Sequence, residues 1–192
     1  MTLDVRPWFG ERMHLAQLNV ARMLAPKDSP ELAGFIAGLE PVNAISDSAP
    51  GFVWRLKGGD GPTDTVQHDH GDMLLINFSV WESREALWDF VYRTVHLDYL
   101  RRRREWFERM AEPYSVMWWI PAGHIPALDE GMARLERLRA HGPTPDAFTF
   151  KDFHEPPLPE AGGREVATAE AGDGAGVLTE KLLVTYEGME PE

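Results

Sequence analysis

"MLLINFSVWESREALWDFVYRTVHLDYL" (residues 73–100) joins the most clearly predicted strand of the chain to its longest predicted helix. Residues 73–81 are almost continuously apolar, which is typical of a strand covered on both faces. Ser83 can cap the helix that follows, with Glu85 in its first turn, and the helical pattern continues to about residue 110. This strand and helix are two consecutive elements of the predicted fold, and the flanking sequence supplies the others.

Hydrophobic periodicity predicts further elements on both sides of this stretch. Pro41 lies inside one predicted helix and is expected to kink or divide it. Gly142 follows the end of another helix, and one more short strand is expected within residues 142–153. The predicted strands are residues 14–23, 52–57, 73–81 and 114–120, and the predicted helices are residues 29–51, 83–110 and 128–141.

The order of these elements predicts an α+β fold, the ferredoxin-like βαββαβ plait, with an additional C-terminal helix. Such a sheet carries its helices on one face and leaves the other bare. Because a bare apolar face usually meets a partner's sheet, we expect a homodimer. The predicted organisation is an N-terminal segment (1–12), the plait domain (13–153) and an acidic arm rich in proline and glycine (154–192). The arm ends in a predicted strand, residues 177–186, which is expected to pair with a sheet edge of its own chain or of a partner; a disordered tail is the alternative.

The composition excludes several classes of function. The 192 residues contain no cysteine, which excludes disulfides, thiolate metal sites and cysteine nucleophiles. The formal net charge is −12, and residues 152–192, with ten acidic and two basic side chains, carry −8 of it. Neither this segment nor the rest has the basic excess of a nucleic-acid-binding protein. No apolar run reaches the roughly 18 residues of a membrane span. We therefore expect no nucleic-acid or membrane partner and a cytoplasmic location.

Alternation along the predicted strands gathers polar side chains on one face of the sheet. If the strand registers match, this face carries Gln17, Asn19, Arg55, Asn77 and Ser79, whereas the opposite face is apolar. A buried carboxamide without a hydrogen-bond partner costs about 1–3 kcal/mol. These side chains therefore either hydrogen-bond to one another and fix the fold, or line a pocket for a ligand. The sequence leaves both interpretations open.

The long predicted helix brings five side chains into one arc beside its core-facing positions: Trp88, Tyr92, His96, Tyr99 and Arg103. Aromatic rings with polar ends are suited to a pocket wall, and they also form ordinary helix edges. For the histidine of this arc, a structural hydrogen bond is the commoner role. Its functional alternatives are proton transfer and ligation of iron.

The closely spaced pair His68 and His70 is the other histidine feature of the sequence. With Asp69 between them, these side chains could in principle hold zinc or nickel. They lie in a loop rich in glycine, and no second cluster of ligands accompanies them. A solvated hairpin tip is therefore favoured, and no metal site is predicted.

Four stretches of the sequence carry a resemblance to a known family. They are "HLAQLNVARM" (14–23), "LEPVNAISDSAPGFVWRL" (39–56), "NFSVWESREALWDFVYRTVHLDYLRRRREWF" (77–107) and "WWIPAGHIPALDEGMARLERLRAHGPTPDAFTF" (118–150). Together they resemble a bacterial domain family of uncharacterised function that is grouped with the dimeric α/β-barrel superfamily. The resemblance covers roughly residues 13–150. Relatives in that superfamily include antibiotic-biosynthesis-type monooxygenases, which work without a cofactor, and haem-degrading monooxygenases.

The resemblance implies a barrel that two plaits form, sheet to sheet, across a homodimer, with the substrate between sheet and helices. In the monooxygenases an asparagine on the first strand, a tryptophan and, in the haem group, a helix histidine carry the chemistry. Asn19 and His96 stand at comparable places in this sequence. Trp54, Trp81 or Trp119 is the candidate for the tryptophan.

The leading hypothesis is an oxygenase-like enzyme, a cofactor-independent monooxygenase, that acts on a hydrophobic aromatic or polyketide-type small molecule. Asn19 and Asn77 would orient the substrate oxygen and His96 would move a proton. The first alternative is a haem protein with His96 as axial iron ligand, and the second is a non-catalytic ligand-binding or dimerisation module. The expected substrate-binding residues are Gln17, Trp54, Arg55, Trp88, Tyr92, Tyr99, Arg103 and Trp119.

Overall fold

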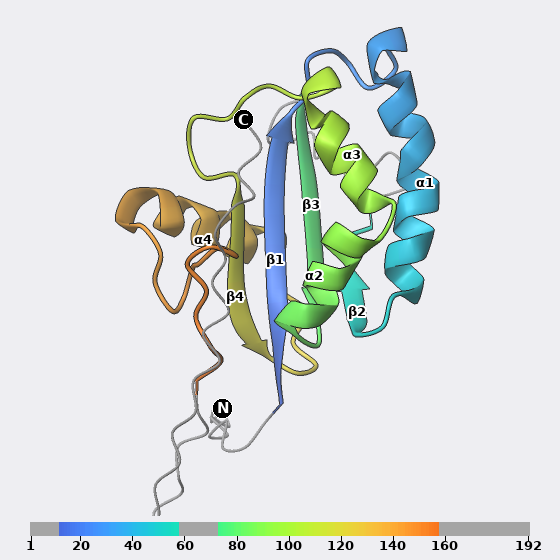
Figure 1. Cartoon of the computed structure of the whole chain (residues 1–192). Coiled ribbons are helices and arrows are strands. Elements are labelled where there is room, and N and C mark those ends of the chain that lie inside the picture. The colour runs from blue at the N-terminus through green and yellow to red at the C-terminus, as the bar shows by residue number, and fades with distance from the viewer. Residues whose placement is uncertain (1–11, 58–72, 158–192) are drawn as a thin grey trace, which may run out of the picture. The chain divides into compact units, whose positions relative to one another are not determined.

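The computed structural model describes residues 12–57 and 73–157, which form a four-stranded antiparallel sheet with helices on both faces (Figure 1). The predicted strand at 177–186 and the loop with His68 and His70 lie outside the described residues. Within these residues, no helix has the length and apolar character that crossing a membrane requires. The strands are β1 (Met13–Arg22), β2 (Phe52–Arg55), β3 (Leu74–Trp81) and β4 (Ser115–Pro121), and the helices are α1 (Ala33–Ser48), α2 (Arg84–Arg93), α3 (His96–Arg102) and α4 (Leu128–His141).

The strands lie in the order β2-β3-β1-β4 across the sheet, and each pair of neighbours is antiparallel. This order confirms the predicted ferredoxin-like plait. β1 is central, and its Asn19 lies opposite Asn77 of β3 on one side and Ser115 of β4 on the other. The registers that the grouping of polar residues required are therefore present.

A bulge in β2 changes the faces on which its aromatic side chains lie. Alternation predicts that Phe52 and Trp54 share a face, but the register shifts between them. Phe52 lies opposite Trp81 and packs on its ring, with the ring centroids 5.3 Å apart. Trp54 lies opposite Val80 and packs edge-on against Phe78 of the other face. The prediction of a shared face was wrong.

The single long helix predicted from residue 83 to 110 is broken into α2 and α3, followed by a 3-10 turn at Arg103–Glu105. The break is at Thr94, whose backbone is extended (φ −119°, ψ −177°). The Thr94 hydroxyl donates to the carbonyl of Phe90 at 2.7 Å and accepts from the amide of His96 at 3.2 Å. One side chain thus caps the end of one helix and the start of the next, because its hydroxyl replaces backbone hydrogen bonds.

Two smaller predictions concern Pro41 and the segment after α4. α1 runs through Pro41 and is not divided there, and the alternative of a kink at this residue stays a prediction. The segment 142–153 forms no strand; it makes an isolated bridge to the β4 edge, in which Met117 and Phe148 exchange backbone hydrogen bonds of 2.8 and 2.9 Å. The bridge shields part of an otherwise open sheet edge.

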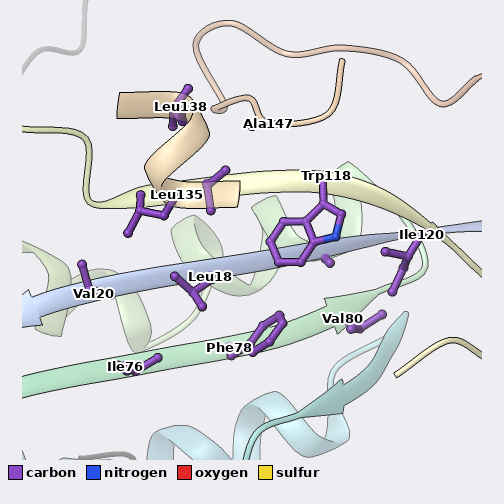
Figure 2. Packing of buried hydrophobic residues seen from close by; sticks show 12 residues of the cluster. Leu18, Val20, Ile76, Phe78, Val80, Trp118, Ile120, Leu135, Leu138 and Ala147 are labelled. Atoms are coloured by element: carbon purple, nitrogen blue, oxygen red, sulfur yellow. The ribbon is translucent and has the colours of Figure 1, made fainter. Parts of the chain in front are cut away.

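The apolar face of the sheet is covered by α4, so the prediction of a bare face was wrong (Figure 2). Leu18, Phe78 and Trp118 of the sheet pack with Leu135 of the helix, and all four side chains are at most 2% exposed. Gly131 brings α4 close, because a Cβ there would lie 2.6 Å from the Leu18 Cδ1. The homodimer stays a prediction, since this face is already buried within the chain.

Candidate functional site

A row of polar side chains crosses the sheet on the face that carries α1, α2 and α3. Asn19 lies opposite Asn77, Gln17 lies opposite Ser79, and Ser79 also lies opposite Arg55 of β2. All five side chains are half-buried. The structure therefore brings together the residues that strand alternation groups on one face, and they are called the polar row below.

Two apolar clusters enclose the polar row along the strands. On one side, Leu15 and Trp81 pack with Leu87 of α2. On the other side, Leu75 packs in a cluster that includes residues of α1 and Tyr99 of α3. α2 thus belongs to one cluster and α3 to the other, and both helices run over β1 and β3 (Figure 1).

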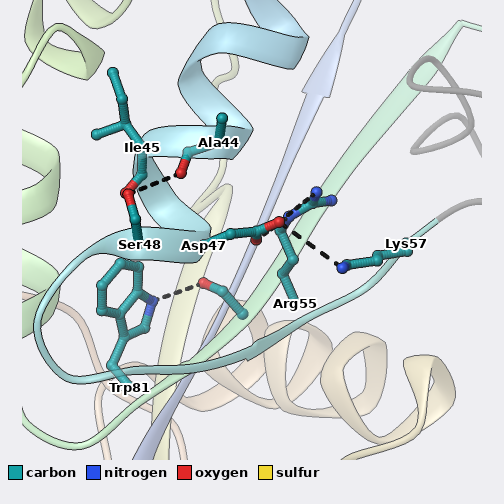
Figure 3. Close-up of polar contacts among 8 residues, drawn as sticks. Ala44, Ile45, Asp47, Ser48, Arg55, Lys57 and Trp81 are labelled. Atoms are coloured by element: carbon teal, nitrogen blue, oxygen red, sulfur yellow. Dashed lines mark hydrogen bonds and ion pairs between the residues drawn. The ribbon is translucent and has the colours of Figure 1, made fainter.

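A chain of hydrogen bonds runs along the polar row. The Trp81 Nε1 donates to the Ser79 Oγ at 2.9 Å, a bond drawn in Figure 3. The Ser79 hydroxyl donates to the Gln17 Oε1 at 3.3 Å, and the Gln17 Nε2 donates to the Asn19 Oδ1 at 2.9 Å. A longer contact of 3.5 Å joins the Gln17 Nε2 to the Ser115 Oγ. The chain leaves the Asn19 Nδ2 without a partner among the described residues.

The amide of Asn77 is not used to hold the fold together. Its carboxamide makes no hydrogen bond within the described residues, although it lies directly opposite Asn19. Within residues 12–57 and 73–157, the fully buried side-chain atoms that lack a partner are the His14 Nδ1, the Ser29 Oγ and the Thr144 Oγ1, and no amide of the polar row is among them. Solvent therefore reaches the free groups of Asn19 and Asn77, and a ligand could replace it.

The positive charge of the polar row is already paired. The Arg55 guanidinium donates to both carboxylate oxygens of Asp47, at 2.7 and 3.2 Å, and Lys57 lies 3.8 Å from the same carboxylate (Figure 3). The hydrogen bond from Arg55 lowers the pKa of Asp47, with the charges of Arg55 and Lys57 adding to it against the opposing effect of burial. The groups of the row left for a ligand are therefore neutral amides.

His96 begins α3 and is held by the segment just before it. Its Nδ1 lies 3.2 Å from the carbonyl oxygen of Val91, which can only accept, so Nδ1 carries the proton. Its ring packs on Phe90, with centroids 5.0 Å apart, and Phe90 in turn stacks on Trp81. Burial lowers the pKa of His96, and the bond to Val91 opposes this only in part. The side chain is a neutral imidazole whose Nε2 carries a lone pair.

The other residues of the predicted helix arc fall into two groups, because the helix is broken. Trp88 and Tyr92 lie together, with centroids 4.2 Å apart, and both face Phe150. Burial raises the pKa of Tyr92. Tyr99 packs instead on Trp106, and the Arg103 Nη1 donates to the carbonyl of Leu100 at 3.0 Å. The prediction that these side chains form one continuous arc was wrong.

Of the three candidate tryptophans, Trp81 is the one joined to the polar row. Trp54 lies on the α4 side of the sheet. Trp119 packs on Phe153 and donates to the carbonyl of His154 at 2.8 Å. Sequence reasoning missed the part played by Thr94, for which a hydroxyl on a β-branched residue inside a helical pattern was the available signal. Within residues 12–57 and 73–157, no group of three His, Asp or Glu side chains could hold a metal ion.

Comparison with known proteins gives one sequence family and several distant folds. A family model described as "Domain of unknown function (DUF3291)" matches residues 14–162. No curated protein matches the chain. A protein of unknown function from Nitrosomonas europaea is similar in structure, with a TM-score of 0.38, 13% identity, and coverage of 62% of this chain and 99% of that one. SnoaB, a cofactor-independent oxygenase from Streptomyces nogalater, has a TM-score of 0.36, 17% identity, and coverage of 58% and 95%. Likenesses this distant say nothing about the chemistry of this chain.

Proposed function

The chain belongs to the DUF3291 family, a domain of unknown function, and we propose that it is an oxygenase-like enzyme for a hydrophobic aromatic small molecule. The observation that carries the proposal is the polar row, whose solvent-reached amides of Asn19 and Asn77 lie between two buried apolar clusters. A few polar groups set among aromatic side chains suit a flat ligand with few oxygen atoms. A purely structural row would bond its amides to one another, and Asn77 is left out of the hydrogen-bond chain.

In the proposed reaction His96 removes a proton from a phenolic substrate, and Asn19 and Asn77 orient the oxygen that becomes negative. The lone pair on Nε2 and the lowered pKa leave His96 ready to accept a proton at neutral pH. Amide N–H groups aimed at a developing oxyanion stabilise it. The resulting anion is electron-rich enough at carbon to react with dioxygen directly. When a CH2 group is oxidised to C=O, one oxygen atom enters the product and the other leaves as water.

Oxygen uptake with a panel of anthrone-type and naphthol-type phenols tests this proposal. We expect consumption of one dioxygen per substrate by the wild type, and a fall of about 10²- to 10⁴-fold in the rate for His96→Gln, the usual contribution of a general base. His141→Gln is the matched control, because His141 is exposed at the end of α4. Equal rates in the two variants would remove His96 from the mechanism. No uptake and no binding by the wild type across the panel would reject the proposed function.

Haem binding is the second candidate, and one observation favours it. An imidazole whose Nδ1 is held by a backbone carbonyl offers Nε2 to a metal in the way that iron-ligating histidines do. When bound, haem would supply dioxygen activation at its iron. Arg55 and Arg103 are the side chains expected to pair with the haem propionates, and they fit this role poorly, because Arg55 is paired with Asp47 and Arg103 donates to the carbonyl of Leu100. A haemin titration followed by absorption spectroscopy distinguishes the candidates: a sharp Soret band that is lost in His96→Ala would place haem first.

A further inference from the structure

We infer that the hydrogen-bond chain from Trp81 fixes the direction of the Asn19 amide, so that the site presents N–H donors to an acceptor oxygen of its ligand. The inference rests on the proposed function for the identity of the site. It adds the class of oxygen that the ligand carries there, a carbonyl or a deprotonated hydroxyl, and it gives roles to Trp81, Ser79 and Gln17.

The donor-to-acceptor direction of the hydrogen-bond chain is set by Trp81, its first member. An indole N–H can only donate, so the Ser79 Oγ accepts from Trp81 at 2.9 Å and has one proton of its own left to give. The one acceptor bonded to that hydroxyl within the described residues is the Gln17 Oε1, at 3.3 Å. The Gln17 amide is therefore oriented with its oxygen towards Ser79 and its nitrogen towards Asn19.

The same direction continues to the end of the chain. Because the Gln17 Nε2 donates to the Asn19 Oδ1 at 2.9 Å, the oxygen of Asn19 is occupied and its Nδ2 is the group left for a ligand. Turning both amides by 180° would exchange these atoms. It would also leave the Ser79 hydroxyl without an acceptor among the described residues, in a site that is half-buried. The chain therefore disfavours the reversed arrangement.

The two asparagine amides of the polar row differ in freedom as a result. Asn19 is a fixed donor, whereas the carboxamide of Asn77, opposite it in register, has no hydrogen-bond partner among the described residues and can turn to suit a ligand. With Arg55 paired to Asp47, the fixed group that meets the ligand is a neutral donor. A ligand hydroxyl that has to donate finds no acceptor at the Asn19 Nδ2, whereas a carbonyl or phenolate oxygen accepts a hydrogen bond from it.

Trp81 is a positioning residue in this scheme. Its side chain is 0% exposed, so it does not touch a ligand, and it acts through Ser79 and Gln17. Trp81→Phe retains an aromatic ring to pack on Phe90 but removes the indole N–H. Ser79→Ala cuts the chain at its second member, and Ser79→Thr retains the hydroxyl and serves as the conservative control.

The test uses two probes of nearly equal shape, 2-acetylnaphthalene and 2-isopropenylnaphthalene, which differ in an acceptor oxygen. We expect calorimetry on the full chain to give a Kd about five- to tenfold lower for the ketone, as one net hydrogen bond provides. Ser79→Ala and Trp81→Phe should bring the ratio of the two Kd values close to one, with the alkene Kd unchanged. Ser79→Thr should retain the preference. Substitution of a residue that merely supports the fold would weaken the binding of both probes alike.

The indole proton of Trp81 gives a second readout that needs no ligand. In NMR spectra its resonance should move upfield in Ser79→Ala, where the acceptor is gone, and stay near the wild-type position in Ser79→Thr. Equal ketone preference in wild type and Ser79→Ala, or an indole resonance that Ser79→Ala does not move, would overturn the inference alone. Failure of the wild type to bind either probe would instead overturn the proposed function.

Discussion

Gly38 of α1 is the position at which a single methyl group should have the largest effect on the helices above the polar row. A Cβ there would overlap the Oη, Cζ and Cε1 atoms of Tyr99 on α3. The Tyr99 ring cannot withdraw freely, because it stacks on Trp106 with centroids 5.8 Å apart. Overpacking costs about 1–3 kcal/mol, and because three atoms of a held ring overlap here, the cost lies in the upper part of that range, at about 2–3 kcal/mol. Replacing glycine by alanine inside a helix returns about 1 kcal/mol. We therefore expect Gly38→Ala to lower the free energy of unfolding by about 1–2 kcal/mol.

Urea denaturation followed by tryptophan fluorescence measures this change, and two further variants make it decisive. Gly34→Ala is the matched control, because a Cβ there meets its nearest neighbour, the Trp106 Cζ2, at an ordinary 3.8 Å. It should be neutral or stabilising by up to about 1 kcal/mol. In a Tyr99→Leu background the overlapping ring atoms are gone, so Gly38→Ala should change sign and become neutral or stabilising. If Gly38→Ala alone is as stable as the wild type, α1 and α3 do not pack as described.

The remaining predictions concern His96 and the helix break before it. Burial lowers the pKa of His96, so the unfolded protein binds a proton at this histidine more tightly than the folded protein does. Above the unfolded pKa of about 6.5 the histidine is neutral in both states, and its full contribution to stability is present. This contribution is lost as the pH falls below that value. Urea titrations from pH 8 to pH 5 should show the wild type losing stability relative to His96→Gln, and parallel curves would contradict the burial of this side chain. Thr94→Val removes the hydroxyl that bonds to Phe90 and His96, and it should lower the free energy of unfolding by about 1–2 kcal/mol in the same assay. Thr94→Ser keeps the hydroxyl and should remain within about 0.5 kcal/mol of the wild type. A valine variant as stable as the wild type would show that the helix break does not depend on the hydroxyl.

The sheet and its polar row could be predicted from sequence because both depend on a two-residue alternation. Once the strands are identified, Gln17 and Asn19 share a face whatever else the chain does. Their pairing with Ser79 and Asn77 needed a register, and the apolar residues that flank them in both strands restrict it. What alternation could not reveal is the bulge before Trp54, where one extra residue reverses the face without any change in composition.

The arrangement of the helices was less predictable, for a different physical reason. The helical pattern continues through Thr94 without interruption, and the break depends on one hydroxyl that competes with backbone bonds. The split of the predicted arc, with Trp88 and Tyr99 in separate groups, follows from that one residue. The sequence does not reveal whether the apolar face is covered by α4 or by a second copy of the chain, because the face would bury the same apolar side chains in both cases.

One face of the sheet is buried in the core and the other carries the polar row, and this difference affects which substitutions the protein can accept during evolution. On the α4 side, residues such as Leu18 and Phe78 are sealed in the core, so most replacements there would reduce the amount of folded protein. On the other side, the carboxamide of Asn77 makes no hydrogen bond within the described residues and remains open to solvent. Replacements at such a position would alter what the proposed site recognises, with little effect on folding. A descendant of this chain could therefore acquire a new ligand through the polar row while its scaffold stays unchanged.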